Sequence, residues 1–337
     1  MLSEFRYHIT TGEWVLFAPK RDARKKPSDF KPKKDGVSQK KSSLSSCPFE
    51  NPQASGNEEP YFFFSPNGRA SSWTLQVLPN KFPALSRDNI ATSRAIKKEL
   101  YHSTDGIGYH DLIITRSHDK PFYLLSASAA TDVLRAYALR YRMYAKDPQC
   151  AYASLFHNWG PLAGASLYHP HYQLIALPLV PYTITHALSV SKKYYQTHTR
   201  CVHCDVIRAE KKEKVRVIRE NAHAIALAPF ASKEPYQVTI LPKKHNAFFE
   251  DTDDKTMSAV SHLLSWVMKQ IPRACAHSDL NFFIHTAPMR DKKSHTHYHW
   301  HIDVVPKLNI SAGFELGTGI EINPIFPEEA ARDMREN

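Results

Sequence analysis

The sequence lacks any uninterrupted apolar run long enough to cross a membrane as a helix. Its first residues, Met1 to Arg6, show neither the apolar stretch nor the small-residue cleavage site of a secretory signal. Cysteine is scarce and odd in number, with five in 337 residues, which argues against a disulfide framework. We therefore expect a cytoplasmic protein of about two ordinary domains, whose cysteines either bind metal or are simply buried.

Acidic residues are too few to balance the basic ones, and the formal net charge is +11. This excess favours an anionic partner: nucleic acid, a membrane surface or a small molecule that carries phosphate. Much of it lies between Lys20 and Lys41, in a stretch that we interpret mainly as a solvated arm. Arg21 and Arg24 lie close to a strand expected at Trp14–Ala18, so they are better candidates for specific phosphate contacts.

Two halves of the chain repeat the same order of features. Each begins with cysteine, continues with a strand that leads to a histidine, then a helix and a strand, and ends in a histidine-rich strand closed by proline. The closing prolines are Pro178 and Pro306, and aligning the halves on them relates His299 to His171 and His301 to Gln173. The repeat predicts an α+β fold of two tandem domains, 1–190 and 191–337, each an antiparallel sheet with packed helices.

The first histidine-rich strand carries three polar side chains in alternation. His169, His171 and Gln173 would project from one face of a strand, which is not the pattern of a packed core. Just before them, the turn from Gly160 to Ser166 could offer backbone N–H groups and a hydroxyl to a phosphate. A neutral imidazole is a competent nucleophile near pH 7, so this combination predicts phosphate chemistry at a histidine.

These residues resemble a known family. His169-Pro-His171-Tyr-Gln173, preceded by Asn158-Trp-Gly160 and Gly164-Ala-Ser166, is similar to the signature of the galactose-1-phosphate uridylyltransferase family. That family is the transferase branch of the histidine-triad (HIT) superfamily, and the chain also resembles ADP-glucose phosphorylase. The resemblance runs from about residue 6 to residue 333. It implies two tandem HIT-like domains, of which the first is catalytic.

The resemblance implies a ping-pong nucleotidyltransferase. His171 would attack the α-phosphorus of a sugar nucleotide, and the nucleotidyl group would then pass to a hexose 1-phosphate or to phosphate. The implied catalytic residues are His171, Gln173 and Ser166. The implied substrate-binding residues are Asn158, Asn80, Arg21, Arg24, Phe314 and Glu315. In the family the last two belong to a segment that reaches a site shared between subunits, so a homodimer is implied as well.

The family also carries metal, and the resemblance implies one or two zinc ions here. The first site would use Cys47, Glu50, His118 and His169, with Glu50 standing where the family usually has a second cysteine. Zinc accepts carboxylate oxygen, but a weakened site is an open alternative. The second site would use Cys201, Cys204, His245 and His299, and the choice of His299 over His297 or His301 stays open.

Three functions remain in competition. The leading prediction is a UDP-glucose:hexose-1-phosphate uridylyltransferase of galactose metabolism, and the close alternative is ADP-glucose phosphorylase, because the residues separate the two bases poorly. A zinc-containing nucleic-acid-binding protein would fit the net charge and the Cys201/Cys204 pair. It would not explain the histidine strand with its phosphate turn, so nucleic acid is not the favoured partner, and no membrane partner is expected.

Overall fold

The computed structural model describes residues 2–24, 44–87, 95–98, 100–276 and 279–336. Most of the basic arm, residues 25–41, therefore lies outside the described residues. None of the described helices is both long and apolar enough to span a membrane.

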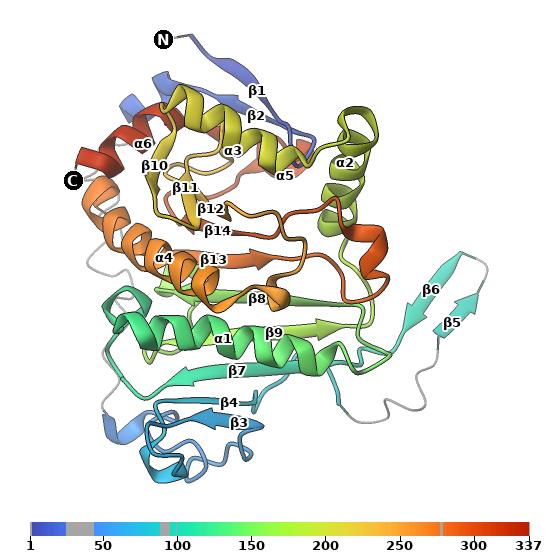
Figure 1. Cartoon of the computed structure of the whole chain (residues 1–337), viewed down its shortest axis with the longest axis vertical. Helices are drawn as coiled ribbons and strands as arrows, with labels where there is room; N and C mark the ends of the chain where they lie inside the picture. The colour runs from blue at the N-terminus through green and yellow to red at the C-terminus, as the bar shows by residue number, and fades with distance from the viewer. Residues whose placement is uncertain (1, 25–43, 88–94, 99, 277–278, 337) are drawn as a thin grey trace.

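A ten-stranded sheet in which every neighbouring pair is antiparallel forms the centre of the molecule (Figure 1). In spatial order its strands are β10 (Val217–Glu220), β11 (Ala224–Leu227), β12 (Val238–Pro242), β14 (His301–Pro306), β13 (Leu280–His285), β8 (Tyr152–Trp159), β9 (His171–Leu177), β7 (Tyr109–Thr115), β4 (Leu75–Pro79) and β3 (Phe62–Phe64). The first five strands come from the second half of the chain and the last five from the first half. Strands β13 and β8 join the halves, with Phe283 opposite Phe156. The predicted duplicated α+β fold is confirmed.

Two long helices, α1 (Ala127–Tyr144) and α4 (Asp254–Cys275), cover the same face of this sheet, one in each half (Figure 1). Each begins at a residue whose side chain accepts a hydrogen bond from the first turn, Ser126 for α1 and Asp253 for α4. The helices contact each other through the hydroxyls of Thr131 and Ser261, 2.7 Å apart. Their apolar faces and the sheet form one buried cluster that spans both halves.

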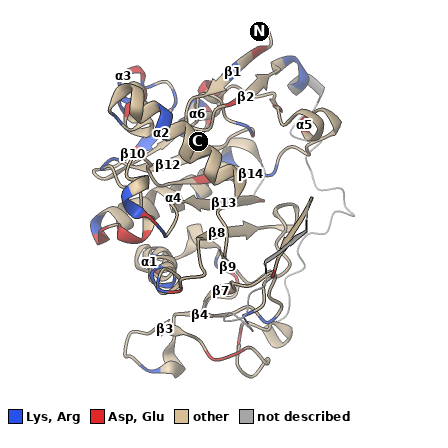
Figure 2. Cartoon of the chain, turned by 90° about the vertical axis from the view of Figure 1, so that its right-hand side faces the viewer, with Lys and Arg blue, Asp and Glu red and all other residues tan. Residues whose placement is uncertain are grey.

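A second group of elements lies beyond the second-half end of the sheet (Figures 1 and 2). A three-stranded sheet forms there from β1 (Glu4–His8), β2 (Glu13–Phe17) and β15 (Glu321–Asn323). The helices near it are η1 (Pro19–Arg24), α2 (Tyr182–His198), α3 (Val202–Glu213), α5 (Gly313–Thr318) and α6 (Pro327–Glu336). The predicted domain boundary at residue 190 falls inside α2, and the division into two domains stays a prediction.

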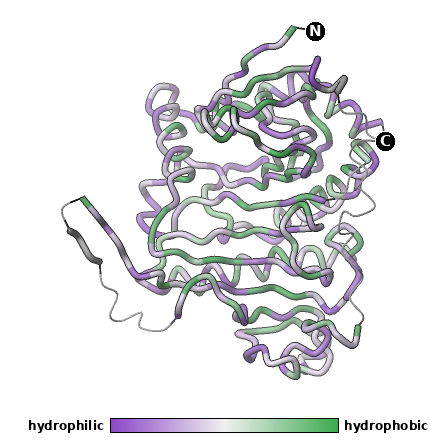
Figure 3. The backbone as a smooth tube through the Cα atoms, turned by 180° about the vertical axis from the view of Figure 1, so that it is seen from behind, coloured by the Kyte–Doolittle hydropathy of each residue, from purple (hydrophilic) through white to green (hydrophobic). Residues whose placement is uncertain are grey.

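A small hairpin of β5 (Ala95–Lys98) and β6 (Tyr101–Thr104) projects away from the main sheet, as the view from behind shows (Figure 3). The direction in which side chains point from the main sheet determines which residues are available for chemistry. On β9, Tyr172 and Leu174 are fully buried in the core with α1. Because side chains alternate along a strand, His171 and Gln173 point to the opposite face, on which the described residues of this half form no long helix.

Candidate functional site

His171 is the first residue of β9, and only 5% of it is exposed. Its Nδ1 lies 3.1 Å from the carbonyl oxygen of His169. A carbonyl can only accept, so Nδ1 carries the proton and Nε2 keeps its lone pair. Burial lowers the pKa of His171, which favours the neutral ring. The result is an imidazole held in the tautomer that a nucleophile needs.

A second histidine fixes the backbone of the first. His157 on β8 is fully buried, and its Nδ1–H donates to the carbonyl of His171 at 2.7 Å. Burial lowers the pKa of His157 to about 3, so this ring is neutral near pH 7. Its ring lies against Tyr172, with centroids 4.5 Å apart. The start of β9 is thereby held from the neighbouring strand.

The turn between β8 and β9 depends on two glycines. Gly160 and Gly164 have φ values of 87° and 82°, a region that side chains rarely tolerate. Asp279 accepts a hydrogen bond from the backbone N–H of Leu162 at 2.9 Å and so ties the turn to β13. Asn281 donates both to Asn158 Oδ1 (2.8 Å) and to the Ala163 carbonyl (2.9 Å).

Asn281 therefore holds the Asn158 side chain against this turn, whereas Ser166, which belongs to the turn, is exposed. Asn80 follows β4, and its backbone N–H donates to the carbonyl of His110 on β7 at 2.9 Å. The sheet brings Asn80, Asn158, Gln173 and His171 to one region because β4, β7, β9 and β8 are consecutive neighbours.

The structure brings Cys47, Glu50, His118 and His169 together, with one potential ligand atom of each within 4.8 Å of the others. His169 Nδ1 lies 3.5 Å from both Cys47 Sγ and Glu50 Oε1. Around a tetrahedral zinc ion, a sulfur and a nitrogen lie about 3.6 Å apart and a nitrogen and an oxygen about 3.4 Å. His169 Nε2–H donates to the Thr115 carbonyl at 2.7 Å, which leaves Nδ1 for a metal. The donor set and its spacing fit zinc.

The second quartet has the same construction. Cys204 Sγ lies 3.5 Å from His299 Nδ1 and 3.6 Å from His245 Nδ1, and Cys201 Sγ lies 3.9 Å from His299 Nδ1. Both histidines donate Nε2–H to backbone carbonyls, His299 to that of Pro242 and His245 to that of Thr296. The hydrogen bond between the two thiols lowers the pKa of Cys204 and raises that of Cys201. These residues also fit zinc, and His297, which bonds to the Leu188 carbonyl, lies outside the group.

The two quartets correct the register of the repeat. His299 occupies the place of His169, so the counterpart of His171 is His301, whose Nδ1 likewise bonds to the carbonyl two residues earlier (3.0 Å). The predicted equivalence of His299 with His171, and of His301 with Gln173, is wrong. Gln173 corresponds instead to Asp303, because β14 and β9 both begin at the second histidine.

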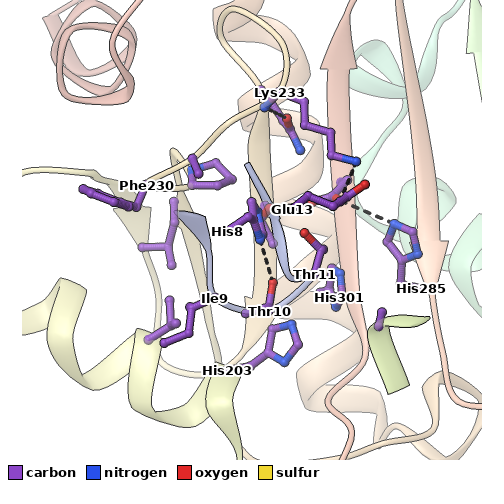
Figure 4. A pocket seen from close by; sticks show the side chains of 18 of the residues that line it. His8, Ile9, Thr10, Thr11, Glu13, His203, Phe230, Lys233, His285 and His301 are labelled. Carbon is purple, nitrogen blue, oxygen red and sulfur yellow. Dashed lines mark hydrogen bonds and ion pairs between the residues drawn. The ribbon is translucent and has the colours of Figure 1, made fainter. Parts of the chain in front are cut away.

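The region around His301 differs from that around His171. It opens on a cavity of about 860 Å³, where His203 and His285 flank His301 with ring centroids 4.8 Å and 4.7 Å away (Figure 4). His285 Nε2 lies 3.4 Å from Asp303, which also accepts from Thr239. A carboxylate in place of Gln173 would repel a phosphate, so the nucleotidyl chemistry is expected in the first half only.

The remaining predicted substrate residues lie elsewhere. Arg21 and Glu315 line a second cavity, of about 440 Å³, and Phe314 is adjacent to Glu315 on α5. Helix α5 lies near the small sheet beyond the β10 end of the main sheet, and η1 directly follows β2 of that small sheet, whereas β9 is the seventh strand counted from β10 (Figures 1 and 2). The Arg24 side chain lies outside the described residues. The predicted site thus falls into two separate groups within one chain.

Comparisons with known proteins agree with this architecture. A family model described as a domain of unknown function (DUF4921) matches residues 65–337. ADP-glucose phosphorylase of Arabidopsis thaliana is 35% identical over 99% of this chain and 92% of its own length. Galactose-1-phosphate uridylyltransferase of Thermotoga maritima is 26% identical over 99% of this chain and 98% of its own.

Solved structures also resemble the chain over nearly its whole length. The structure of the Arabidopsis phosphorylase with bound ADP-glucose superposes with a TM-score of 0.84 at 32% identity, over 100% of this chain and 99% of that one. A uridylyltransferase structure superposes with a TM-score of 0.72 at 25% identity, over 99% of this chain and 98% of that one.

Proposed function

Because the chain belongs to the family that contains galactose-1-phosphate uridylyltransferase and ADP-glucose phosphorylase, we propose that it transfers a nucleotidyl group through a covalent bond to His171. The observation that carries the proposal is the buried, neutral imidazole whose Nδ1–H is held by the His169 carbonyl. Its side chain lies on the sheet face opposite α1, which also carries Gln173, and the Phe49 ring packs against it with centroids 5.5 Å apart.

The proposed reaction has two displacements at the same phosphorus. Nε2 of His171 attacks the α-phosphorus of a sugar nucleotide, a P–N bond forms, and the P–O bond to hexose 1-phosphate breaks with its electron pair. An oxygen of the acceptor phosphate then attacks the phosphorus, and the P–N bond breaks to restore the imidazole. Gln173, Ser166 and Asn158 donate hydrogen bonds to the phosphoryl oxygens, where fixed donors stabilise the transition state.

In this scheme the two metal sites have a structural role and take no part in the reaction. Zinc bound by Cys47, Glu50, His118 and His169 would anchor the residue two positions before the nucleophile. His169 would thus be tied at both ring nitrogens, to metal and to the Thr115 carbonyl, while its own carbonyl orients His171. The quartet around Cys204 would do the same for the start of β14.

We also infer a homodimer, because it would unite the two separated groups of substrate residues. A cationic and an acidic side chain at the far end, Arg21 and Glu315, would complete the His171 site of a second copy. Mixing His171→Ala subunits with Glu315→Ala subunits tests this directly, since a mixed dimer holds one intact shared site. Activity should return on mixing two inactive proteins; no recovery, despite exchange of subunits, would exclude a shared site.

The leading substrate pair is UDP-glucose with a hexose 1-phosphate. Adenylyl transfer from ADP-glucose to phosphate is the second candidate, favoured by the 35% identity to the Arabidopsis phosphorylase. Steady-state assays of both reactions with the same enzyme preparation decide between them. We expect transfer in one assay and its abolition by His171→Ala, with the exposed His262→Ala as a control. Undiminished transfer by His171→Ala would end the proposed mechanism.

A further inference from the structure

His110 is a buried polar residue next to the proposed site that has no function in the scheme above. It lies on β7, the neighbour of β9, and is 9% exposed. In the strand register His110 stands opposite Ile175, so its side chain is diagonal to that of Gln173 on the same face. Nε2 of His110 lies 3.0 Å from Oε1 of Gln173.

The backbone decides which nitrogen of His110 carries the proton. The N–H of Ala84 donates to Nδ1 at 3.0 Å, and a backbone amide can only donate. Nδ1 therefore keeps its lone pair, and the neutral ring carries its hydrogen on Nε2. This N–H donates to Gln173 Oε1. The loop after β4 thus sets the tautomer of His110 from a position outside the strands of the site.

The hydrogen bond in turn decides which way the Gln173 carboxamide faces. With Oε1 turned to His110, the amide NH2 is directed to the other side, where it can donate to a ligand. The reversed amide would place two N–H donors against each other at 3.0 Å, which is repulsive. Without His110, the two orientations would differ little, because nitrogen and oxygen of an amide have nearly the same shape.

The neighbouring Asn80 is held in a related way. Its Oδ1 accepts from the backbone N–H of Phe82 at 3.0 Å, and its Nδ2 lies 3.1 Å from His110 Nε2. With Nε2 of His110 protonated, this is a close approach of two donors rather than a hydrogen bond, so the Asn80 amide is oriented by the Phe82 N–H and not by His110.

We propose that His110 is a positioning residue for nucleotidyl transfer, which acts by holding Gln173 with its N–H donors toward the phosphoryl oxygens. This inference rests on the proposed function of His171. It predicts a specific dependence: His110 contributes to the rate only through Gln173. A general structural role would have no such dependence.

The test is the single-turnover rate at which the protein takes a nucleotidyl label from UDP-glucose or ADP-glucose. His110→Ala should slow labelling about tenfold to a hundredfold at saturating sugar nucleotide, the effect expected of a misplaced group. His110→Gln, whose amide N–H can replace the Nε2–H, should recover most of the rate. The exposed His262→Ala should label like the wild type, and melting temperatures show whether each variant is folded.

The double variant distinguishes a positioning role of His110 from a general structural role. In the Gln173→Ala background, adding His110→Ala should change the labelling rate by less than about twofold, because the group it positions is gone. A further tenfold loss in that background, or an unchanged rate in His110→Ala alone, would overturn the role of His110 while leaving His171 in place. A folded wild type that takes no label would overturn the proposed function and this role together.

Discussion

Replacing Gly160 by alanine should damage the turn that precedes β9. Gly160 has φ 87° and ψ 158°, a combination open almost only to glycine, and forcing it costs about 1–3 kcal/mol. An added Cβ would lie 2.2 Å from Asp279 Cγ, so that side chain must move. Its hydrogen bond with the Leu162 N–H would then be lost, at about 1 kcal/mol. Together we expect about 3 kcal/mol of lost stability, an order-of-magnitude sum of these two contributions.

Gly164 is the matched control in the same turn. It lies in the ordinary left-handed region (φ 82°, ψ 19°), and its added Cβ would meet only Asn158 Nδ2, at 3.8 Å. Gly164→Ala should therefore cost about 1–2 kcal/mol, from backbone strain alone. Urea denaturation of both variants measures the difference, and the labelling rate of His171 should fall further in Gly160→Ala. Equal stabilities of the two variants would refute the reasoning about Asp279.

The remaining predictions concern the metal content and the ion pairs of Glu328 with Arg6 and Arg216. Cys204→Ser should remove one equivalent of zinc and Glu50→Ala should weaken a different one, as elemental analysis of each purified variant would show; a single shared loss would contradict two sites. Glu328→Gln should cost about 1 kcal/mol at neutral pH. Burial raises the pKa of Glu328, but hydrogen bonds from Arg6 and Arg216 lower it overall. The stabilisation by these ion pairs is therefore present above the ordinary pKa of a glutamate and is lost as the pH falls through the lowered pKa of the folded protein. Thermal melts over a series of falling pH values should therefore show a difference between wild type and variant that shrinks as the pH falls through the lowered pKa; a difference that does not change with pH would count against the ion pairs.

The duplicated fold could be predicted because its signals are local. Alternating strands, helical spacing and the order of cysteines and histidines recur in both halves of the sequence. The ligand quartets came from the resemblance to the family, whose metal ligands were matched to the cysteines and histidines of each half. What the repeat could not show is that β13 and β8 pair to make one sheet, which depends on contacts between halves.

The register of the second half was wrong for a physical reason. Proline was used as the marker of the strand end, but Pro306 lies at the level of Ala176, two residues before Pro178 on the equivalent strand. A proline can end or border a strand at several positions, whereas metal ligands must meet at one point. The histidines were therefore the better landmarks.

The residues that support the site could not have been found from local pattern. His110 is 63 positions from Gln173, and Asn281 is 123 positions from Asn158. Each is an ordinary polar residue in a strand, and only the sheet order shows what it contacts. His157 is similar: it could have been noticed as a histidine in an apolar strand, but its bond to the His171 carbonyl needs the β8–β9 register.

The most direct test of the central claim is the mass of the protein itself after a brief incubation with UDP-glucose or ADP-glucose, without acceptor. We predict a gain of one uridylyl or adenylyl group per chain, located on His171 by peptide mapping and removed when the acceptor phosphate is added. A protein that turns over sugar nucleotide while its mass never changes, or one whose label lies on another residue, would contradict the account.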